Sequence, residues 1–349
     1  MSIAQNQEAI VKFDNVDIVF GTKPELALPL IDAGKSREEI QKETGQILGV
    51  AGASLEVQEG ETLVLMGLSG SGKSTLLRGV NGLNKVIRGS IEVRTDKGWV
   101  NPATADTDVL RDMRLSTVSM VFQQFALLPW RSVADNIGLG LELAGVEKSK
   151  LQSRVGEQLK LVGLEGWGEK KVQELSGGMQ QRVGLARAFA TEAPILLMDE
   201  PYSALDPLIR ARLQDELIDL QKRLRRTIIF VSHDLDEAIK IGSRIAIMEG
   251  GRIIQCGTAA DILNNPANDY VADFVAHMNP LAVCTAGDAM QKAARKKTGE
   301  KDAPEVAIDT PLKSVIERQL ESGMPVYVSA GGKIIGRIDA GAVYATLLR

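Results

Sequence analysis

The sequence predicts an α/β fold over residues 1–280, followed by a small α/β unit at residues 311–349. Helical patterns separate several continuous apolar runs, which are typical of strands covered on both faces. A glycine-rich turn near residue 70 also joins a strand pattern to a helix pattern, as in mostly parallel sheets. The apolar runs lie at 118–122, 195–199, 227–231 and 244–248.

The elements before the glycine-rich turn follow in order. Residues 11–20 alternate and are rich in β-branched and aromatic types, which predicts a strand. Within the next segment, 22–49, Ser36 and Glu39 have the spacing of a capping box, and Gly45 marks a stop, so we expect a short helix. Residues 50–66 return to strand character.

The elements after the turn include two regions without apolar strand runs. Residues 125–190 are expected to form a mostly helical part of the larger domain. Residues 281–310 contain a charged and polar stretch, which predicts a solvated linker. The final unit at 311–349 is expected to contain a helix from Leu312 to Glu321, two strands, and a last helix from Gly341.

Composition excludes some classes of protein. The net charge of −4 gives no support for a nucleic-acid partner, which would favour a basic face. Cys256 and Cys284 lack metal-like spacing and are expected to be reduced thiols of a cytosolic protein. No apolar run approaches the roughly 20 residues that span a bilayer, and the amino end does not resemble a signal peptide. Any membrane role is therefore expected to run through a partner.

The glycine-rich turn has a pattern that binds phosphate groups. Its spacing is Gly-x-x-x-x-Gly-Lys-Ser, with a strand before it and a helix after it. Glycines let backbone amides turn towards phosphates, the helix presents its positive end, Lys73 reaches the phosphates, and Ser74 offers a hydroxyl to Mg²⁺. The candidate nucleotide-binding residues are Gly67, Ser69, Gly70, Ser71, Gly72, Lys73, Ser74 and Thr75.

Two carboxylates follow the apolar run at 195–199. Asp199 ends this predicted strand, where it can hold Mg²⁺, and Glu200 comes directly after it, where it can act as general base on a water molecule. Alone, an apolar run ending in two acids is a weak signal. Together with the phosphate-binding turn it predicts nucleotide hydrolysis.

The run Leu175-Ser176-Gly177-Gly178-Met179-Gln180-Gln181 resembles the signature motif of ABC transporter ATPases, with Met179 where that family most often has glutamine. Ser176, Gly177 and Gly178 begin a predicted helix, which suits an anion. The resemblance implies a P-loop NTPase fold with a RecA-like core, an antiparallel β part and a helical subdomain. It also implies a head-to-tail homodimer that holds ATP between the P-loop of one copy and the signature of the other.

The remaining family landmarks follow in order. Gln123 resembles the glutamine that contacts Mg²⁺ or water, and Gln124 is an open alternative. Asp206 lies in a run that resembles the loop crossing the dimer interface. His233 resembles the histidine that contacts the γ-phosphate. Phe20 is a candidate to stack on adenine, with a core phenylalanine as its competitor. The second histidine, His277, has no such context and is expected to be incidental.

Two features resemble the importers of quaternary amines, such as choline, glycine betaine and proline betaine. The first is segment 22–49, for which a neutral surface insertion is the alternative. The second is residues 311–349, which resemble a single CBS motif, where glycine betaine relatives carry two in tandem. This unit is expected to support dimerisation or, alternatively, regulation, and its short length favours choline as the cargo.

The resemblance also implies partners. A separate integral-membrane permease would hold the chain at the cytoplasmic face of the inner membrane, and a periplasmic or extracellular substrate-binding protein would act through that permease. Phe125, Leu127 and Trp130 are candidate permease contacts, with core packing as the alternative. An importer of another small solute, a soluble ABC ATPase and an exporter remain alternatives. The soluble class typically has two cassettes or long coiled coils, and this sequence has one P-loop and one signature.

Overall fold

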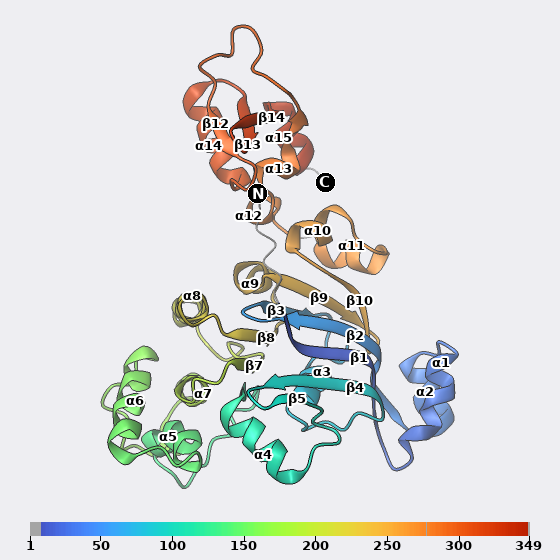
Figure 1. The fold of residues 1–349 in the computed structure, drawn as a ribbon, viewed down its shortest axis with the longest axis vertical. Coiled ribbons are helices and arrows are strands. Elements are labelled where there is room, and N and C mark those ends of the chain that lie inside the picture. The colour runs from blue at the N-terminus through green and yellow to red at the C-terminus, as the bar shows by residue number, and fades with distance from the viewer. Residues whose placement is uncertain (1–7, 277, 348–349) are drawn as a thin grey trace. The chain divides into compact units, whose positions relative to one another are not determined.

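The computed structural model describes residues 8–276 and 278–347, so His277 lies outside the described residues. The chain divides into two compact units, one made of residues 7–254 and one built on residues 255–349 (Figure 1). The division therefore lies earlier than the boundary predicted at residue 280. Among the described residues, no helix combines the length and the apolar character needed to cross a membrane. Cys284 is buried, and Cys256 is half-buried.

The first sheet of the larger unit has four strands in the order β2-β1-β4-β5, and all its strand pairs are antiparallel. The predicted strand at 11–20 is confirmed as β1. The strand character expected at 50–66 is divided between β2 and Thr62–Met66 (β3), which belongs to the second sheet. The bounds of the four strands are Ala9–Phe20 for β1, Ile47–Gln58 for β2, Arg88–Thr95 for β4 and Gly98–Val100 for β5.

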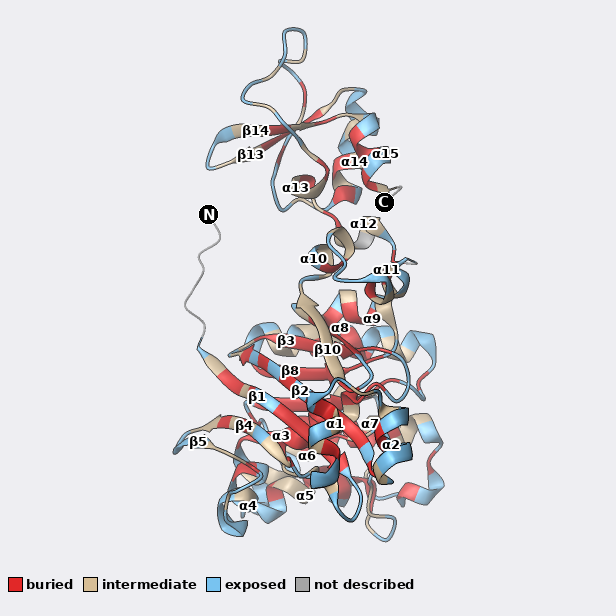
Figure 2. Ribbon diagram, turned by 90° about the vertical axis from the view of Figure 1, so that its right-hand side faces the viewer, coloured by how far each residue is buried: buried red, intermediate tan, exposed pale blue. Residues whose placement is uncertain are grey.

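The second sheet has six strands in the order β10-β9-β3-β8-β7-β6, and the pairs from β9 to β6 are parallel. Every residue of β3, β7 and β8 is buried, as Figure 2 shows for β3 and β8. This confirms the interpretation of the apolar runs at 195–199 and 227–231, whereas Ser119 and Met120 of the run at 118–122 are half-buried. Because parallel strands end at one edge, the residues that follow β3, β6, β7 and β8 gather there. The strands are Thr62–Met66 (β3), Val118–Val121 (β6), Ile195–Asp199 (β7), Thr227–Val231 (β8), Arg244–Glu249 (β9) and Arg252–Gly257 (β10).

The helices of the larger unit fall into two groups. One group connects the strands of the second sheet, and the other occupies residues 125–190, which are mostly helical, as predicted. The connecting helices are Lys73–Val80 (α3), Thr107–Ser116 (α4), Pro207–Leu224 (α8) and Leu235–Ile241 (α9). The helical part contains Val133–Leu143 (α5), Lys148–Leu161 (α6), a 3-10 turn at Val172–Glu174 (η2) and Gly177–Ala190 (α7).

Segment 22–49 contains the helix that the capping box predicts. Ser36 accepts a hydrogen bond from the backbone of Glu39 and Glu39 from the backbone of Ser36, while Gly45 ends the helix in the left-handed conformation. Ile40 is buried in an apolar cluster that the segment shares with Leu48 and Ala51 at the start of β2. Its elements are the 3-10 turn Pro24–Ala27 (η1), Leu28–Asp32 (α1) and Arg37–Thr44 (α2).

The smaller unit has a four-stranded sheet in the order β11-β14-β13-β12. The helix and strands predicted after residue 311 are confirmed, and the last helix begins one residue earlier than predicted. Its helices are Ala259–Asn264 (α10), Asp269–Val275 (α11), Pro280–Val283 (α12), Ala286–Ala289 (α13), Leu312–Ser322 (α14) and Ala340–Leu347 (α15). Its strands are Gln291–Lys292 (β11), Glu305–Ala307 (β12), Val326–Ala330 (β13) and Lys333–Ile338 (β14).

The prediction of a solvated linker at 281–310 is wrong. These residues supply α13, β11 and β12, and Ala286, Ala289 and Val306 are buried in the core of the smaller unit. The charged stretch misled the prediction because its charges are paired within the unit. Glu300, for example, forms an ion pair of 2.9 Å with Arg337 of β14. The polar composition reflects ionic contacts to the sheet and not a free connector.

Candidate functional site

The phosphate-binding turn lies between β3 and α3, and its glycines are required by close packing. Gly67 has a φ of +140°, and a Cβ there would lie 2.1 Å from the carbonyl oxygen of Met248. Gly72 has a φ of +100°, and a Cβ there would lie 2.4 Å from the carbonyl oxygen of Gly49. Any other side chain at these two positions would displace the backbone, so the loop shape depends on glycine.

Lys73 lies inside the curve of this loop. Its Nζ donates hydrogen bonds to the carbonyl oxygens of Gly67 at 2.8 Å and Leu68 at 3.0 Å. Burial lowers the pKa of Lys73, and the negative charges of Glu200 and Asp199 partly oppose that shift. Helix α3 begins here with Gly72 as its cap and no side-chain cap bond, so its first backbone N–H groups are available to an anion.

Asp199 is fully buried at the end of β7, where two residues of α3 hold its carboxylate. Ser74 Oγ donates to Oδ1 at 2.6 Å, and Arg78 Nη2 donates to Oδ2 at 2.8 Å. The sequence indicated Ser74 and missed Arg78. A signal was present, because Arg78 is four residues after Ser74 and so lies on the same face of the helix.

Glu200 has a backbone conformation that is rare for a residue with a side chain. Its φ is +46°, and such a conformation costs roughly 1–3 kcal/mol. The surrounding bonds maintain it, because Gln181 Nε2 donates to the Glu200 carbonyl at 3.3 Å and Ser203 Oγ donates to the same oxygen at 3.1 Å. Gln181 Oε1 also accepts a hydrogen bond from the backbone N–H of Ala204 at 3.0 Å, so this side chain links Glu200 to Ala204. The sequence did not indicate this role.

The Glu200 side chain meets the two other residues predicted to act in catalysis. Gln123 Nε2 donates to Glu200 Oε2 at 3.0 Å, and His233 Nδ1 lies 3.6 Å from the same oxygen. Gln123, Glu200 and His233 follow β6, β7 and β8, so the common edge of the sheet brings them together. Gln123 and not Gln124 makes the bond to Glu200, and Gln124 lines a neighbouring groove.

The signature residues form a second cluster. Ser176 caps α7 by accepting a hydrogen bond from Met179 at 3.4 Å, and a Cβ on Gly178 would lie 3.3 Å from the carbonyl of Ala204. Asp206 caps α8 through a bond of 3.0 Å from Ile209. No hydrogen bond joins Ser176 or Asp206 to the phosphate-binding turn within residues 8–276 and 278–347. The structure therefore brings the signature beside residues 204–206 and not onto the P-loop of the same chain.

Phe20 lies beside the phosphate-binding turn and is not a core residue. Its side chain is 41% exposed. A Cβ built on Gly49 would lie 2.9 Å from Cε2 of Phe20 and 2.8 Å from Cγ2 of Thr75, so both side chains flank the same glycine. This position suits a flat ring that packs against a ligand held by the turn.

Comparison with known proteins identifies the family. A model for ABC transporters matches residues 50–203. The glycine betaine transport ATP-binding protein OpuAA of Bacillus subtilis (strain 168) is 49% identical, over 81% of this chain and 67% of its own. The glycine betaine/proline betaine transport ATP-binding protein ProV of Escherichia coli (strain K12) is 43% identical, over 97% of this chain and 82% of its own. The chain belongs to the ATP-binding subunits of ABC transporters.

The ABC ATPase fold is also shown by a solved structure. The dimeric structure of a post-hydrolysis state of the ATP-binding cassette MJ0796, bound to ADP and Pi, is 30% identical with a TM-score of 0.61. It covers 71% of this chain, and this chain covers 98% of it. The predicted fold class of the ABC ATPase domain is therefore confirmed, and the activity of the family is ATP hydrolysis coupled to transport.

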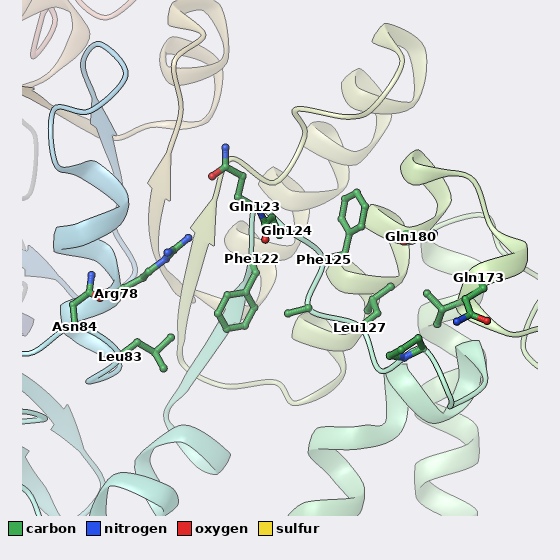
Figure 3. Close-up of a pocket in the computed structure, with 13 residues that line it drawn as sticks. Arg78, Leu83, Asn84, Phe122, Gln123, Gln124, Phe125, Leu127, Gln173 and Gln180 are labelled. Atoms are coloured by element: carbon green, nitrogen blue, oxygen red, sulfur yellow. The ribbon is translucent and has the colours of Figure 1, made fainter.

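This ABC ATPase also has a groove between its sheet edge and its helical part. The groove has a volume of 820 Å³ and opens along the loop that follows β6 (Figure 3). Phe125 and Leu127 line it, whereas Trp130 is 69% exposed and does not. Phe122 and Leu83 lie at one end and Gln173 at the other (Figure 3).

Proposed function

We propose that this chain hydrolyses ATP in order to drive the import of a quaternary ammonium compound through a separate membrane permease. The observation that carries the hydrolytic part is the contact of Glu200 with both Gln123 and His233 beside the P-loop. The cargo is supported by relatives, because OpuAA and ProV are named for glycine betaine and proline betaine transport. Choline as the cargo stays a narrower prediction.

In the proposed site, Gly67–Thr75 surrounds the phosphates of ATP, and Lys73 places a positive charge among them. The hydroxyl of Ser74 and the carboxylate of Asp199 are oxygen ligands that suit Mg²⁺, with Gln123 close by. Among the described residues, no group of three or more His, Cys, Asp or Glu side chains could hold a metal. A Mg²⁺ site formed by one carboxylate, a hydroxyl and phosphate oxygens fits that donor set. When bound, the ion would neutralise charge on the phosphates.

The hydrolytic step follows from the residues at the sheet edge. Glu200 accepts a proton from the attacking water, and Gln123 orients the carboxylate through its bond to Oε2. His233 contacts the same oxygen and is free to bond the γ-phosphate, because its side chain is 65% exposed.

The proposed working unit is a head-to-tail homodimer. Within one chain, Gly178 packs against Ala204 and Leu205, and Ser176 caps its own helix. No hydrogen bond joins Ser176 to the P-loop in the part of the chain that the structure describes. A second copy would bring its signature to the ATP held by Lys73. The MJ0796 cassette, described as dimeric, supports this arrangement.

The proposed permease docks in the groove lined by Phe125 and Leu127, next to Gln123. This position would couple the permease to Glu200 through a single side chain. The permease would hold the chain at the cytoplasmic face of the membrane, and a substrate-binding protein would deliver the cargo from the other side. The smaller unit would serve as a CBS-like dimerisation element.

Uptake of labelled glycine betaine and labelled choline in a deletion strain tests the proposal. We expect uptake of one or both compounds to fall after deletion, and to return with the parent chain but not with the Lys73→Ala variant. Uptake that deletion leaves unchanged for both compounds would contradict the cargo. It would leave ATP hydrolysis by the purified protein to be judged on its own.

A further inference from the structure

Segment 22–49 has no part in the function proposed above, yet it is firmly built. Helix α2 is fixed at both ends by the Ser36–Glu39 capping box and Gly45, and Ile40 is fully buried beneath it. Arg252 Nη2 donates a hydrogen bond of 3.1 Å to the carbonyl of Ile31 and ties the segment to β10. A helix held this closely has a defined position relative to the nucleotide site.

Arg37, the first residue of α2, extends towards the P-loop. Its Nε donates a hydrogen bond of 2.7 Å to the carbonyl of Leu48, immediately before the glycine that Phe20 and Thr75 flank. Its Nη1 lies 4.0 Å from the position that a Cβ on Gly70 would occupy. The hydrogen bond to Leu48 and the distance to Gly70 therefore place this guanidinium at the edge of the phosphate-binding turn.

The guanidinium of Arg37 has unused hydrogen-bond donors. Arginine carries five N–H donors, and the hydrogen bond to Leu48 is the only one that Arg37 makes within the described residues. No carboxylate of that part of the chain forms an ion pair with it. Its half-buried position lowers its pKa through desolvation, yet arginine keeps its charge in proteins. A cation with unused donors beside an anion-binding loop is suited to a phosphate.

We propose that Arg37 binds the polyphosphate of the nucleotide held by the P-loop, so that segment 22–49 forms part of the nucleotide site. The inference rests on the proposed site at Gly67–Thr75 and adds to it a cation from outside the P-loop. Arginine suits this role because its planar fork can donate two parallel bonds to phosphate oxygens.

The experiment measures the affinity of the purified full-length chain for ATP, AMP and adenosine, with the Arg37→Ala and Lys42→Ala variants. Lys42 is an exposed lysine on the same helix, so its loss removes the same charge without touching the P-loop edge. Loss of a charge-assisted hydrogen bond predicts that Arg37→Ala weakens ATP binding about tenfold. The loss should be smaller for AMP, absent for adenosine, and reduced by high salt. Lys42→Ala should bind ATP as the parent does.

Further variants separate the possible failures. Arg37→Gln can still donate to Leu48 but has no charge, so we expect it to lose affinity as Arg37→Ala does. Parental affinity in Arg37→Gln, an equal loss in Lys42→Ala, or an equal loss for adenosine would overturn the inference. Lys73→Ala tests the P-loop itself. If Lys73→Ala weakens ATP binding and Arg37→Ala does not, only the role of Arg37 fails. If Lys73→Ala binds as the parent does, the proposed site fails.

Discussion

Glu200 and Glu300, one in each unit, show how similar contacts give a carboxylate opposite roles. Each has an Oε2 that two side chains approach. Glu300 accepts from Tyr327 Oη at 2.5 Å, and Arg337 donates to both of its oxygens. Glu200 receives only the amide of Gln123 and the imidazole of His233 on one oxygen, and no hydrogen bond reaches its Oε1 within the described residues. Glu300 therefore stabilises the fold of the smaller unit, whereas Glu200 keeps one carboxylate oxygen available for a proton.

The two carboxylates also differ in charge stabilisation and in backbone. Arg337, followed by Tyr327, lowers the pKa of Glu300 to about 2, so this group stays ionised and accepts no proton in ordinary conditions. Glu200 has a strained φ of +46°, a cost found at functional sites. The comparison teaches that the chemistry of a carboxylate depends on the oxygens its neighbours leave open, and not on the number of contacts.

The sharpest test of this comparison is substitution of each glutamate by glutamine. Glu200→Gln should lower ATP hydrolysis by at least a hundredfold, because a general base contributes that much or more, while ATP binding is kept. Glu300→Gln should leave the rate of hydrolysis unchanged. The measurement is steady-state ATPase activity of the assembled transporter together with nucleotide binding. Hydrolysis at the parental rate in Glu200→Gln would show that Glu200 is not the base.

A smaller effect is expected from the residue that orients Glu200. Gln123→Ala removes the hydrogen bond to Oε2 and should lower ATP hydrolysis about tenfold, the effect of losing one bond to a charged group. Its neighbour Gln124 lines the groove without bonding Glu200, so in the purified chain without the permease Gln124→Ala should hydrolyse ATP at the parental rate and serves as the matched control. Equal losses in the two variants would mean that the loop, and not the amide of Gln123, sets the rate.

The stability of the smaller unit in acid tests the structural role of Glu300. Because the folded pKa of Glu300 lies below its ordinary value of 4.5, its contribution is present above that value and is lost as pH falls towards about 2. Thermal unfolding followed between pH 5 and pH 2 should therefore show a steeper loss of stability in the parent than in Glu300→Gln. The same dependence of stability on pH in both proteins would argue against this structural role of Glu300.

The smallest expected effect concerns backbone strain. Glu200→Gly relieves the left-handed conformation and should raise the free energy of unfolding of the larger unit by up to about 1 kcal/mol, although activity is lost. Glu300→Gly should lower the stability of the smaller unit instead, since it removes the contacts to Arg337 and Tyr327. Denaturant unfolding of both variants checks the opposite signs. A loss of stability in Glu200→Gly would show that its conformation is not strained.

The sequence predicted the parts of the fold that depend on near neighbours. The capping box of Ser36 and Glu39, the buried strand that ends at Asp199 and the turn at Gly67–Thr75 all appear where they were expected. The linker at 281–310 was wrong because its charges find partners in distant strands. Glu300, for example, pairs with Arg337 of β14 at 2.9 Å, and a composition count cannot show such a contact.

The sequence by itself determined the P-loop, the signature and the two carboxylates, because each is a contiguous pattern whose geometry follows from residues a few positions apart. Only the tertiary structure decided which residues meet. Gln123 reaches Glu200 across 77 positions because neighbouring parallel strands end at a common edge of the sheet. Arg337 of β14 reaches Glu300 across 37 positions because the loop between β11 and β12 folds back onto that sheet. The position of Arg37 beside Gly70 depends in the same way on the packing of a short helix against β2.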